Sequence, residues 1–250
     1  MILKEKQIKE TIGRYYSQIE EYEEYGSTTR YKSWEWCHNE FLKAKEFLSK
    51  GPVTEEHKNN IIDTLSLHLA FYLASWGMYR GSSFLLKRDY KAHKIAVKAI
   101  LSLPADSILW DYQPTKENID EANALLFDKG GIYWKIKDSY GSDVPSEILV
   151  TKILLGTLGC IPAFDRLFKK GISQFDGAVS FEGKEYSLTQ RLESASKNFC
   201  ATDSFRALAA LAAKYSEAFK IQSDIYYPPM RCMDMYFWQI GADLSLNKEK

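Results

Sequence analysis

The stretch of sequence that decides the fold is TKILLGTLGCIPAFDR, residues 151–166. Its first half is apolar and predicts a buried helix, which runs into a turn whose backbone Pro162 restrains. A single aspartate, Asp165, follows that turn where the next helix is expected to begin. A carboxylate at such a position accepts hydrogen bonds from free backbone amides and interacts favourably with the helix dipole. The stretch therefore predicts two helices with a fixed carboxylate between them.

Helical patterns also dominate the rest of the chain. Apolar residues recur at three- and four-residue steps, and short clusters of Gly, Ser, Thr and Pro interrupt them. Thr54 and Ser146 are typical N-cap residues at the start of two of these stretches. We therefore predict a compact all-α domain with helices over residues 4–25, 30–49, 55–79, 84–102, 116–128, 132–137, 147–158, 166–170, 188–199, 203–222 and 230–241.

One segment departs from the helical pattern. Between residues 178 and 187, apolar and polar residues alternate around Gly183, which predicts one short β-hairpin. Directly after it, Ser187–Gln190 has the spacing of a capping box and predicts the helix over 188–199.

Composition sets the limits on domain number and on partners. The chain has 250 residues, 45% of them hydrophobic, enough for one sizeable core. Residues 1–52 are expected to form a polar helical pair beside a main domain over 53–250, and one domain overall is the more economical description. The 33 basic and 33 acidic residues balance to a formal net charge of zero. Because proteins that coat nucleic acid usually carry a positive excess, nucleic-acid binding here would depend on a local basic groove.

The N-terminal residues and the cysteines bear on cellular location and metal binding. The chain turns charged within Met1–Lys6, so no signal peptide is expected. The four cysteines are scattered, form no Cys-x-x-Cys pair, and the four histidines do not fall at zinc-finger spacings. The longest apolar run, 61–79, is too polar to span a membrane. We expect a cytoplasmic protein with reduced thiols, no membrane partner, no metal and no cofactor.

Two segments carry a resemblance to known DNA-repair proteins. Thr151–Leu154 with Ile161–Arg166 resembles the helix-hairpin-helix, 8-oxoguanine DNA glycosylase-type fold, where a small residue, a lysine and two aliphatics precede a Pro-x-aromatic-Asp turn. Met230–Gly241 resembles the closing helix of that group, in which a basic residue, an aspartate three positions on and a tryptophan four further on recur. Trp76–Ser82 is also similar to a signature of a family of bacterial proteins.

The resemblance implies a DNA partner and a set of site residues. Asp165 takes the place of the catalytic aspartate, and Trp76, Arg80, Lys152 and Arg166 are the candidate substrate-binding residues. An aspartate in that role stabilises a positively charged sugar or positions water during base excision. The alternative is that Asp165 only caps the helix that follows it.

The chain also departs from the pattern of these glycosylases. Their DNA-binding hairpin reads apolar-x-Gly-x-Gly, whereas the segment upstream of the motif helix is Gly141–Pro145. The bifunctional enzymes place a nucleophilic lysine about eighteen residues before the aspartate, and that position is Glu147. The resemblance therefore implies a single-function enzyme at most.

A second motif points to a different chemistry. Arg88 and His93 match the Arg-polar-x-x-x-His pattern of HEPN ribonucleases, which are small dimerising helical bundles. In those proteins a histidine transfers the proton of an RNA hydroxyl and an arginine stabilises phosphate charge. The alternative is a solvated helix face that carries both residues. RNA is the partner on this hypothesis, and the third hypothesis is a non-catalytic helical interaction protein.

Overall fold

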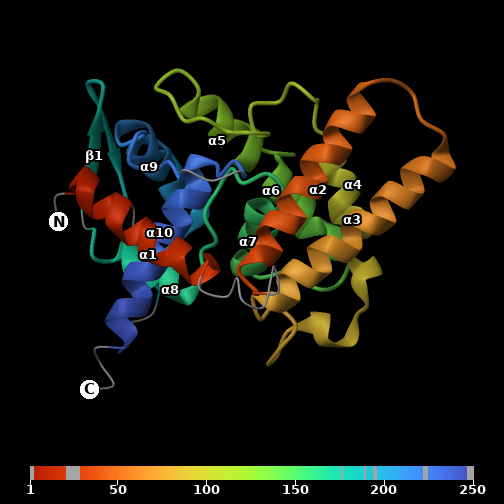
Figure 1. Cartoon of the computed structure of the whole chain (residues 1–250), viewed down its shortest axis with the longest axis horizontal. Helices are drawn as coiled ribbons and strands as arrows, with labels where there is room; N and C mark the ends of the chain where they lie inside the picture. The colour runs from red at the N-terminus through yellow and green to blue at the C-terminus, as the bar shows by residue number, and fades with distance from the viewer. Residues whose placement is uncertain are drawn as a thin grey trace.

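A computed structural model describes residues 3–20, 29–175, 177–188, 190–193, 196–221 and 225–246 of the chain. Helices hold more than half of these residues, which confirms the predicted all-α class (Figure 1). The elements in chain order are α1 (Glu5–Glu20), α2 (Lys32–Ser49), α3 (Glu55–Ser75), the 3₁₀ helices η2 (Phe84–Lys87) and η3 (Tyr90–His93), α4 (Lys94–Leu101), α5 (Ile119–Phe127), α6 (Ile132–Lys137), the 3₁₀ helix η4 (Asp138–Tyr140), α7 (Glu147–Thr157), α8 (Arg166–Ile172), β1 (Ala178–Phe181), β2 (Lys184–Ser187), β3 (Gln190–Glu193), β4 (Ser196–Phe199), α9 (Ala201–Lys214) and α10 (Pro229–Leu246).

Side-chain caps fix the start of α3 and of α7. The Thr54 hydroxyl accepts from the His57 amide at 3.2 Å, and the Ser146 hydroxyl accepts from the Leu149 amide at 3.3 Å. Each bond satisfies one of the amides that an α-helix leaves free at its first turn. Both predicted N-caps are confirmed, although α3 ends at Ser75, four residues before its predicted end.

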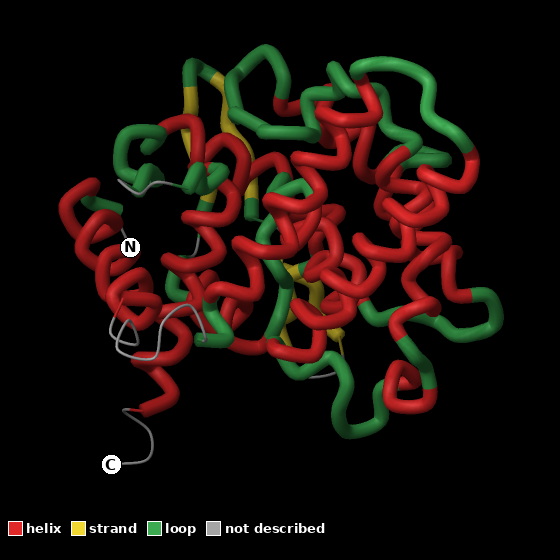
Figure 2. The backbone as a smooth tube through the Cα atoms, turned by 45° about the vertical axis from the view of Figure 1, so that its right-hand side comes forward, coloured by secondary structure: helices red, strands yellow, loops and turns green. Residues whose placement is uncertain are grey.

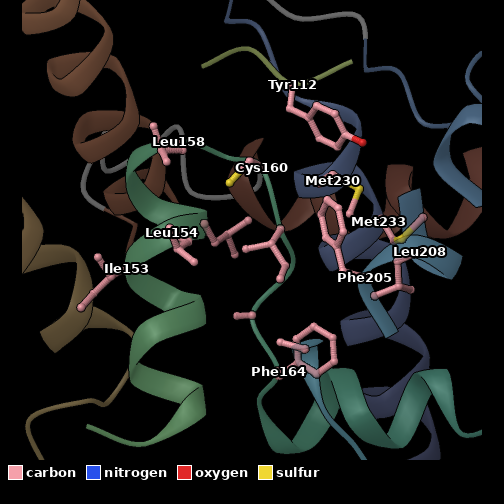
Figure 3. Packing of buried hydrophobic residues seen from close by; sticks show 14 of the residues in the cluster. Tyr112, Ile153, Leu154, Leu158, Cys160, Phe164, Phe205, Leu208, Met230 and Met233 are labelled. Atoms are coloured by element: carbon pink, nitrogen blue, oxygen red, sulfur yellow. The ribbon is translucent and has the colours of Figure 1, made fainter. Parts of the chain in front are cut away.

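The core lies where α7, the turn after it, α9 and α10 meet. Every residue of α7 from Leu149 to Thr157 is buried, so this helix is surrounded by protein on all sides. Figure 3 shows Leu154 on α7 and Leu158 at its C-cap, Cys160 on the segment that follows, and Phe205, Leu208, Met230 and Met233 on α9 and α10 beyond that segment. Burial of these apolar faces supplies the free energy that isolated helices of this length lack.

Helix α2 packs directly against α7 through two hydrogen bonds to its last turn. The Trp34 Nε1 donates to the Leu155 carbonyl at 2.9 Å, and Nδ1 of His38 lies 2.9 Å from the Thr157 carbonyl. Both carbonyls belong to a helix end, where no intrahelical donor remains. Trp34 and His38 are fully buried, so this N-terminal helix contributes to the common core.

Helix α1 is also buried along one side, and it packs against the C-terminal helix. Ile8, Ile12 and Tyr15 lie within the core cluster, in the stripe expected from their three- and four-residue spacing. Figure 1 shows α1 beside α10, with both chain ends on the same side of the molecule. The first and last helices therefore close one side of the domain together.

Two glycines bring α8 against α10 at backbone distance. A side chain at Gly171 would collide with the Phe237 carbonyl, and one at Gly241 would collide with the Leu167 carbonyl. Contact at this distance leaves little room for α8 to shift along α10. Since Asp165 caps α8, this packing also fixes the carboxylate relative to α10.

The predicted hairpin is confirmed, and a second one replaces a predicted helix. Strands β1 and β2 pair antiparallel, with Val179 opposite Tyr186. Strands β3 and β4 also pair antiparallel, so the prediction of a helix over 188–199 is wrong (Figure 2). Leu188 and Phe199 are buried at the two ends of this segment. The capping-box spacing is a local signal, and burial of these two anchors in the core overrides it.

The predicted helix over 84–102 is broken into three pieces. The Ser83 hydroxyl accepts from the Leu85 amide, and the Asp89 carboxylate accepts from the Lys91 amide, so each begins a short 3₁₀ turn. Arg88, between them, has extended backbone. Within 84–102, only α4 forms regular α-helical turns. The Ser83 and Asp89 side chains compete with the helical backbone hydrogen bonds and so interrupt the helix upstream of α4.

Candidate functional site

Asp165 lies at the N-terminus of α8, as predicted. Its Oδ1 accepts from the Leu167 and Phe168 amides, each at 3.0 Å, and its Oδ2 lies 3.0 Å from Nζ of Lys152. The Lys152 side chain is 5% exposed and that of Asp165 is 18% exposed. Both carboxylate oxygens are therefore engaged, yet one edge of the carboxylate still reaches the surface.

The turn that carries Asp165 is held by two side chains from other elements. The Phe164 amide donates to Oγ1 of Thr151 at 3.0 Å, and the Ala163 amide donates to Oδ1 of Asp234 at 3.0 Å. Amides in surface turns can bond to water, but these two are buried and need partners within the protein. Thr151 and Asp234 therefore position the backbone that leads into Asp165.

A second buried ion pair lies behind the turn. Nη1 of Arg231 donates to Oδ2 of Asp234 at 2.6 Å, and its Nη2 donates to the Tyr15 hydroxyl at 3.1 Å. Burial raises the pKa of Asp234 to about 6, while Arg231 opposes that shift. The Asp165 charge adds to the rise and the Lys152 charge reduces it, so the two ion pairs lie within electrostatic range of each other.

Aromatic rings form one wall of the site. Trp76, the C-cap of α3, is partly buried, and Nζ of Lys152 lies 5.4 Å from its ring centroid. The guanidinium of the exposed Arg30 lies 5.5 Å from the same ring. Trp238 and Tyr31 pack edge-on against Trp76 at 6.1 and 5.5 Å. Two cations on one indole are favourable contacts and leave positive charge beside an aromatic plane.

The structure brings together three of the five residues predicted for the DNA site. Trp76, Lys152 and Asp165 are in contact through the Lys152 ammonium. Arg166 follows Asp165 on α8 and is exposed. Arg80 is exposed, and its guanidinium lies over Gly77, where an added Cβ would be 2.8 Å from Nε. These two arginines flank the contact cluster without being part of it.

The two segments that carry the resemblance meet in space. Asp234, from the C-terminal helix, binds the turn before Asp165, and Trp238 packs on Trp76. Arg30 and Thr151 are the contributors that sequence reasoning missed. The hydroxyl at Thr151 gives a weak signal inside an apolar helix, whereas Arg30 gives none.

Arg88 and His93 do not form a joint site. Arg88 makes an exposed ion pair with Asp143 at 2.7 Å. His93 is fully buried, with the Tyr79 and Tyr140 hydroxyls each 2.7 Å from one ring nitrogen. Burial lowers the pKa of His93 to about 4. The alternative of a solvated face is thus wrong for His93, and no helix carries both residues.

The cysteines offer no reactive thiolate in the core. All four are free, with Cys37, Cys160 and Cys232 buried and Cys200 partly exposed. Burial raises the pKa of Cys160 and of Cys232 to about 12. Within the described ranges, no group of three or more His, Cys, Asp or Glu side chains has a metal-binding arrangement.

Comparison of the chain with protein-family models, curated proteins and solved structures gives no match. In the part of the chain that the structure describes, no helix combines the length and apolar character needed to cross a membrane.

Proposed function

We propose that this chain is a DNA-binding protein with a glycosylase-like arrangement of helices, and that its DNA site is centred on Asp165, Lys152 and Trp76. The observation that carries the proposal is the position of the Lys152 ammonium, 3.0 Å from the Asp165 carboxylate and 5.4 Å from the Trp76 ring centroid. The Asp165 carboxylate, the buried Lys152 ammonium and the partly exposed Trp76 indole thus lie next to one another at the edge of the core.

Each part has a role in binding DNA. An unpaired base that displaces the exposed Arg30 from the indole of Trp76 can stack on that ring, and such stacking contributes about 1–3 kcal/mol. Arg30 lies over that ring and is exposed, so its charge is available to a phosphate next to the stacked base. Because the chain has no net charge, these local cations supply the attraction.

On this proposal, Asp165 is the catalytic carboxylate. Base excision develops positive charge on the deoxyribose, and a fixed negative group beside it lowers that barrier. The two amide bonds to Oδ1 and the ammonium at Oδ2 hold the carboxylate in one orientation. Orientation of this kind reduces the reorganisation needed during the reaction.

Binding is tested with fluorescent single-stranded and duplex DNA over a series of salt concentrations. We expect affinity that falls as salt rises, and a loss of at least about fivefold for Arg30→Ala or Trp76→Phe. Lys137→Ala is the matched control, because Lys137 also lies over an indole, that of Trp134 at 5.2 Å, away from the site. Equal loss in the control, or no binding at any salt concentration, contradicts the proposed site.

Excision is tested on duplexes that carry one damaged base, with alkaline cleavage to reveal abasic sites. Asp165→Asn should lower the rate by about 10²–10³-fold if the carboxylate is catalytic. That variant also leaves Lys152 without its counter-charge, so the double variant Lys152→Met/Asp165→Asn separates the two effects. Restored stability with no excision supports catalysis by Asp165. Excision that survives in the double variant rejects it, and binding without any excision favours the interaction-protein hypothesis.

The Arg88–His93 motif carries no second proposal. Its histidine has both ring nitrogens occupied by tyrosine hydroxyls and no exposed atom to offer an RNA hydroxyl.

A further inference from the structure

Helices α2 and α3 form an antiparallel hairpin with an apolar outer face. Trp36, Phe47, Leu67 and Phe71 are exposed on it, with exposed fractions of 47, 43, 55 and 58%. Trp36 and Phe47 are eleven residues apart, three helical turns along one side of α2, and Leu67 and Phe71 are one turn apart on α3. We call these four residues and the groove between them the hairpin face. Exposed apolar groups at this density mark an interaction surface.

A groove of about 330 Å³ lies between the two helices at the end near their connection. Its apolar lining is Ala44, Phe47, Ile61 and Leu65. Polar side chains complete the lining: Thr64, Glu40, Lys43, His57 and Asn60. Phe71 follows Thr64 by seven residues, two turns along the same side of α3. An exposed aromatic ring and an apolar groove therefore lie on one helix at a fixed separation of about 10 Å.

We propose that the hairpin face binds a second copy of this chain in a two-fold symmetric dimer. A two-fold axis between Leu67 and His68 lies midway between Thr64 and Phe71. Antiparallel crossing of the two α3 helices about that axis places Phe71 of each copy opposite Thr64 and the groove of the other. Ring and groove are thus self-complementary, which is what a symmetric dimer interface requires.

Charge at the two ends of the hairpin agrees with this arrangement. Glu55 and Glu56 are exposed in the first turn of α3, at the connected end. Arg80 is exposed just outside the open end, five residues after α3. Antiparallel pairing about that axis brings Glu55 and Glu56 of one copy close to Arg80 of the other. Near the middle, Glu40 and Lys43 form an ion pair at 2.6 Å, so the centre of the face does not repel itself.

The face has the dimensions of a specific interface. Helices of 18 and 21 residues are about 27 and 32 Å long, and two packed helices are about 20 Å wide. The flat projection of this face is about 550–650 Å², which is most of the roughly 800 Å² that each partner buries in a standard interface. Leu67 lies beside the proposed axis at the centre of the interface, and the aromatic side chains of Trp36, Phe47 and Phe71 lie toward the ends of the two helices.

The oligomeric state of the full chain tests the proposal, by sedimentation velocity over a range of concentrations. We expect a reversible dimer, and for Phe71→Glu a dissociation constant at least about tenfold higher, because a charge then faces the apolar groove. Val144→Glu is the control, since Val144 is 79% exposed and lies outside α2 and α3. Circular dichroism checks that both variants keep their helix content.

A cross-link tests the position of the axis. In a Cys200→Ser background, which removes the partly exposed thiol, Leu67→Cys should form a disulfide-linked dimer on mild oxidation. Val144→Cys in the same background should stay monomeric on a non-reducing gel. A chain that sediments as a monomer at every concentration overturns the proposal. A dimer that Phe71→Glu leaves intact, or that cross-links through position 144 and not 67, also overturns it.

Discussion

Two regions of this protein carry charged pairs that the sequence singles out, and the fold treats them in opposite ways. Around α7 and α8, Lys152 and Asp165 meet with the cation buried against an indole and the carboxylate at the surface. Around η2 and η3, Arg88 and His93 separate: the arginine pairs with Asp143 at the surface, and the histidine is enclosed by two tyrosines. Lys152 and Asp165 are thirteen residues apart in the sequence and Arg88 and His93 only five, yet only the more distant pair is brought together, by α7 and α8.

The comparison shows what tertiary packing adds to a motif. Asp165 is fixed by its own helix, by Lys152 from α7 and by the turn that Thr151 and Asp234 hold. Arg88 has extended backbone between two short turns, and nothing orients it toward His93. A functional site needs side chains that several elements of the fold hold in place. Two residues of suitable type and spacing in the sequence do not ensure this.

The largest effect is expected from breaking the buried ion pair. Asp165→Ala removes the α8 cap and leaves Lys152 buried without its counter-charge. The free energy of unfolding should therefore fall by about 3–5 kcal/mol. Chemical denaturation monitored by circular dichroism measures this loss. Lys152→Met/Asp165→Asn should recover most of it, because Asn keeps the cap and no buried charge remains. A double variant as unstable as Asp165→Ala would refute this account of the pair.

The second prediction concerns the enclosed histidine. The pKa of His93 is about 4 in the folded chain, against the ordinary histidine value of 6.5 when the chain is unfolded. The unfolded chain therefore binds the proton more readily, so acidification from pH 6.5 to 4 should lower the free energy of unfolding. At pH values above 6.5, the neutral His93 contributes about 3 kcal/mol to the free energy of unfolding, and this contribution is lost as the pH falls to 4. Denaturation of the wild type and His93→Gln at several pH values isolates it, and parallel pH curves for the two proteins would contradict it.

A smaller effect is expected from the threonine that holds the turn. Thr151 and Thr157 both lie in α7 and both donate to the carbonyl four residues earlier, at 2.8 Å, but only Thr151 also accepts from a turn amide. Thr151→Val leaves the Phe164 amide buried without an acceptor, so it should cost about 1–3 kcal/mol more than Thr157→Val. It should also weaken DNA binding at the proposed site. Equal effects of the two substitutions on stability would show that the turn does not depend on Thr151.

The smallest effect is expected at the surface pair. Arg88 and Asp143 have side chains 52 and 26% exposed, so Arg88→Ala should change the free energy of unfolding by less than about 1 kcal/mol. Labelled single-stranded RNA in EDTA provides the second measurement. Metal-independent cleavage that disappears in both Arg88→Ala and His93→Ala would instead show that the two residues act together.

Local signals in the sequence determined most of the helical framework. The apolar run of α7, the caps at Thr54, Ser146 and Asp165, and the alternating pattern of β1 and β2 are each set by neighbouring residues. Such signals depend on backbone hydrogen bonds a few positions apart, and so they can be recognised without the rest of the fold.

Tertiary structure decided the parts in which local and distant interactions compete. Residues 190–193 and 196–199 pair as strands, with Leu188 and Phe199 buried, against a local capping box. Arg30 and Asp234 reach the site from opposite ends of the chain. The depth at which a side chain is buried, as for His93 and Lys152, follows from all the elements packed around it. The sequence therefore determined where several helices begin and which residues could take part in chemistry. The packing of α3, α7, α8 and α10 decided which of those residues meet, because contact and desolvation depend on the whole core.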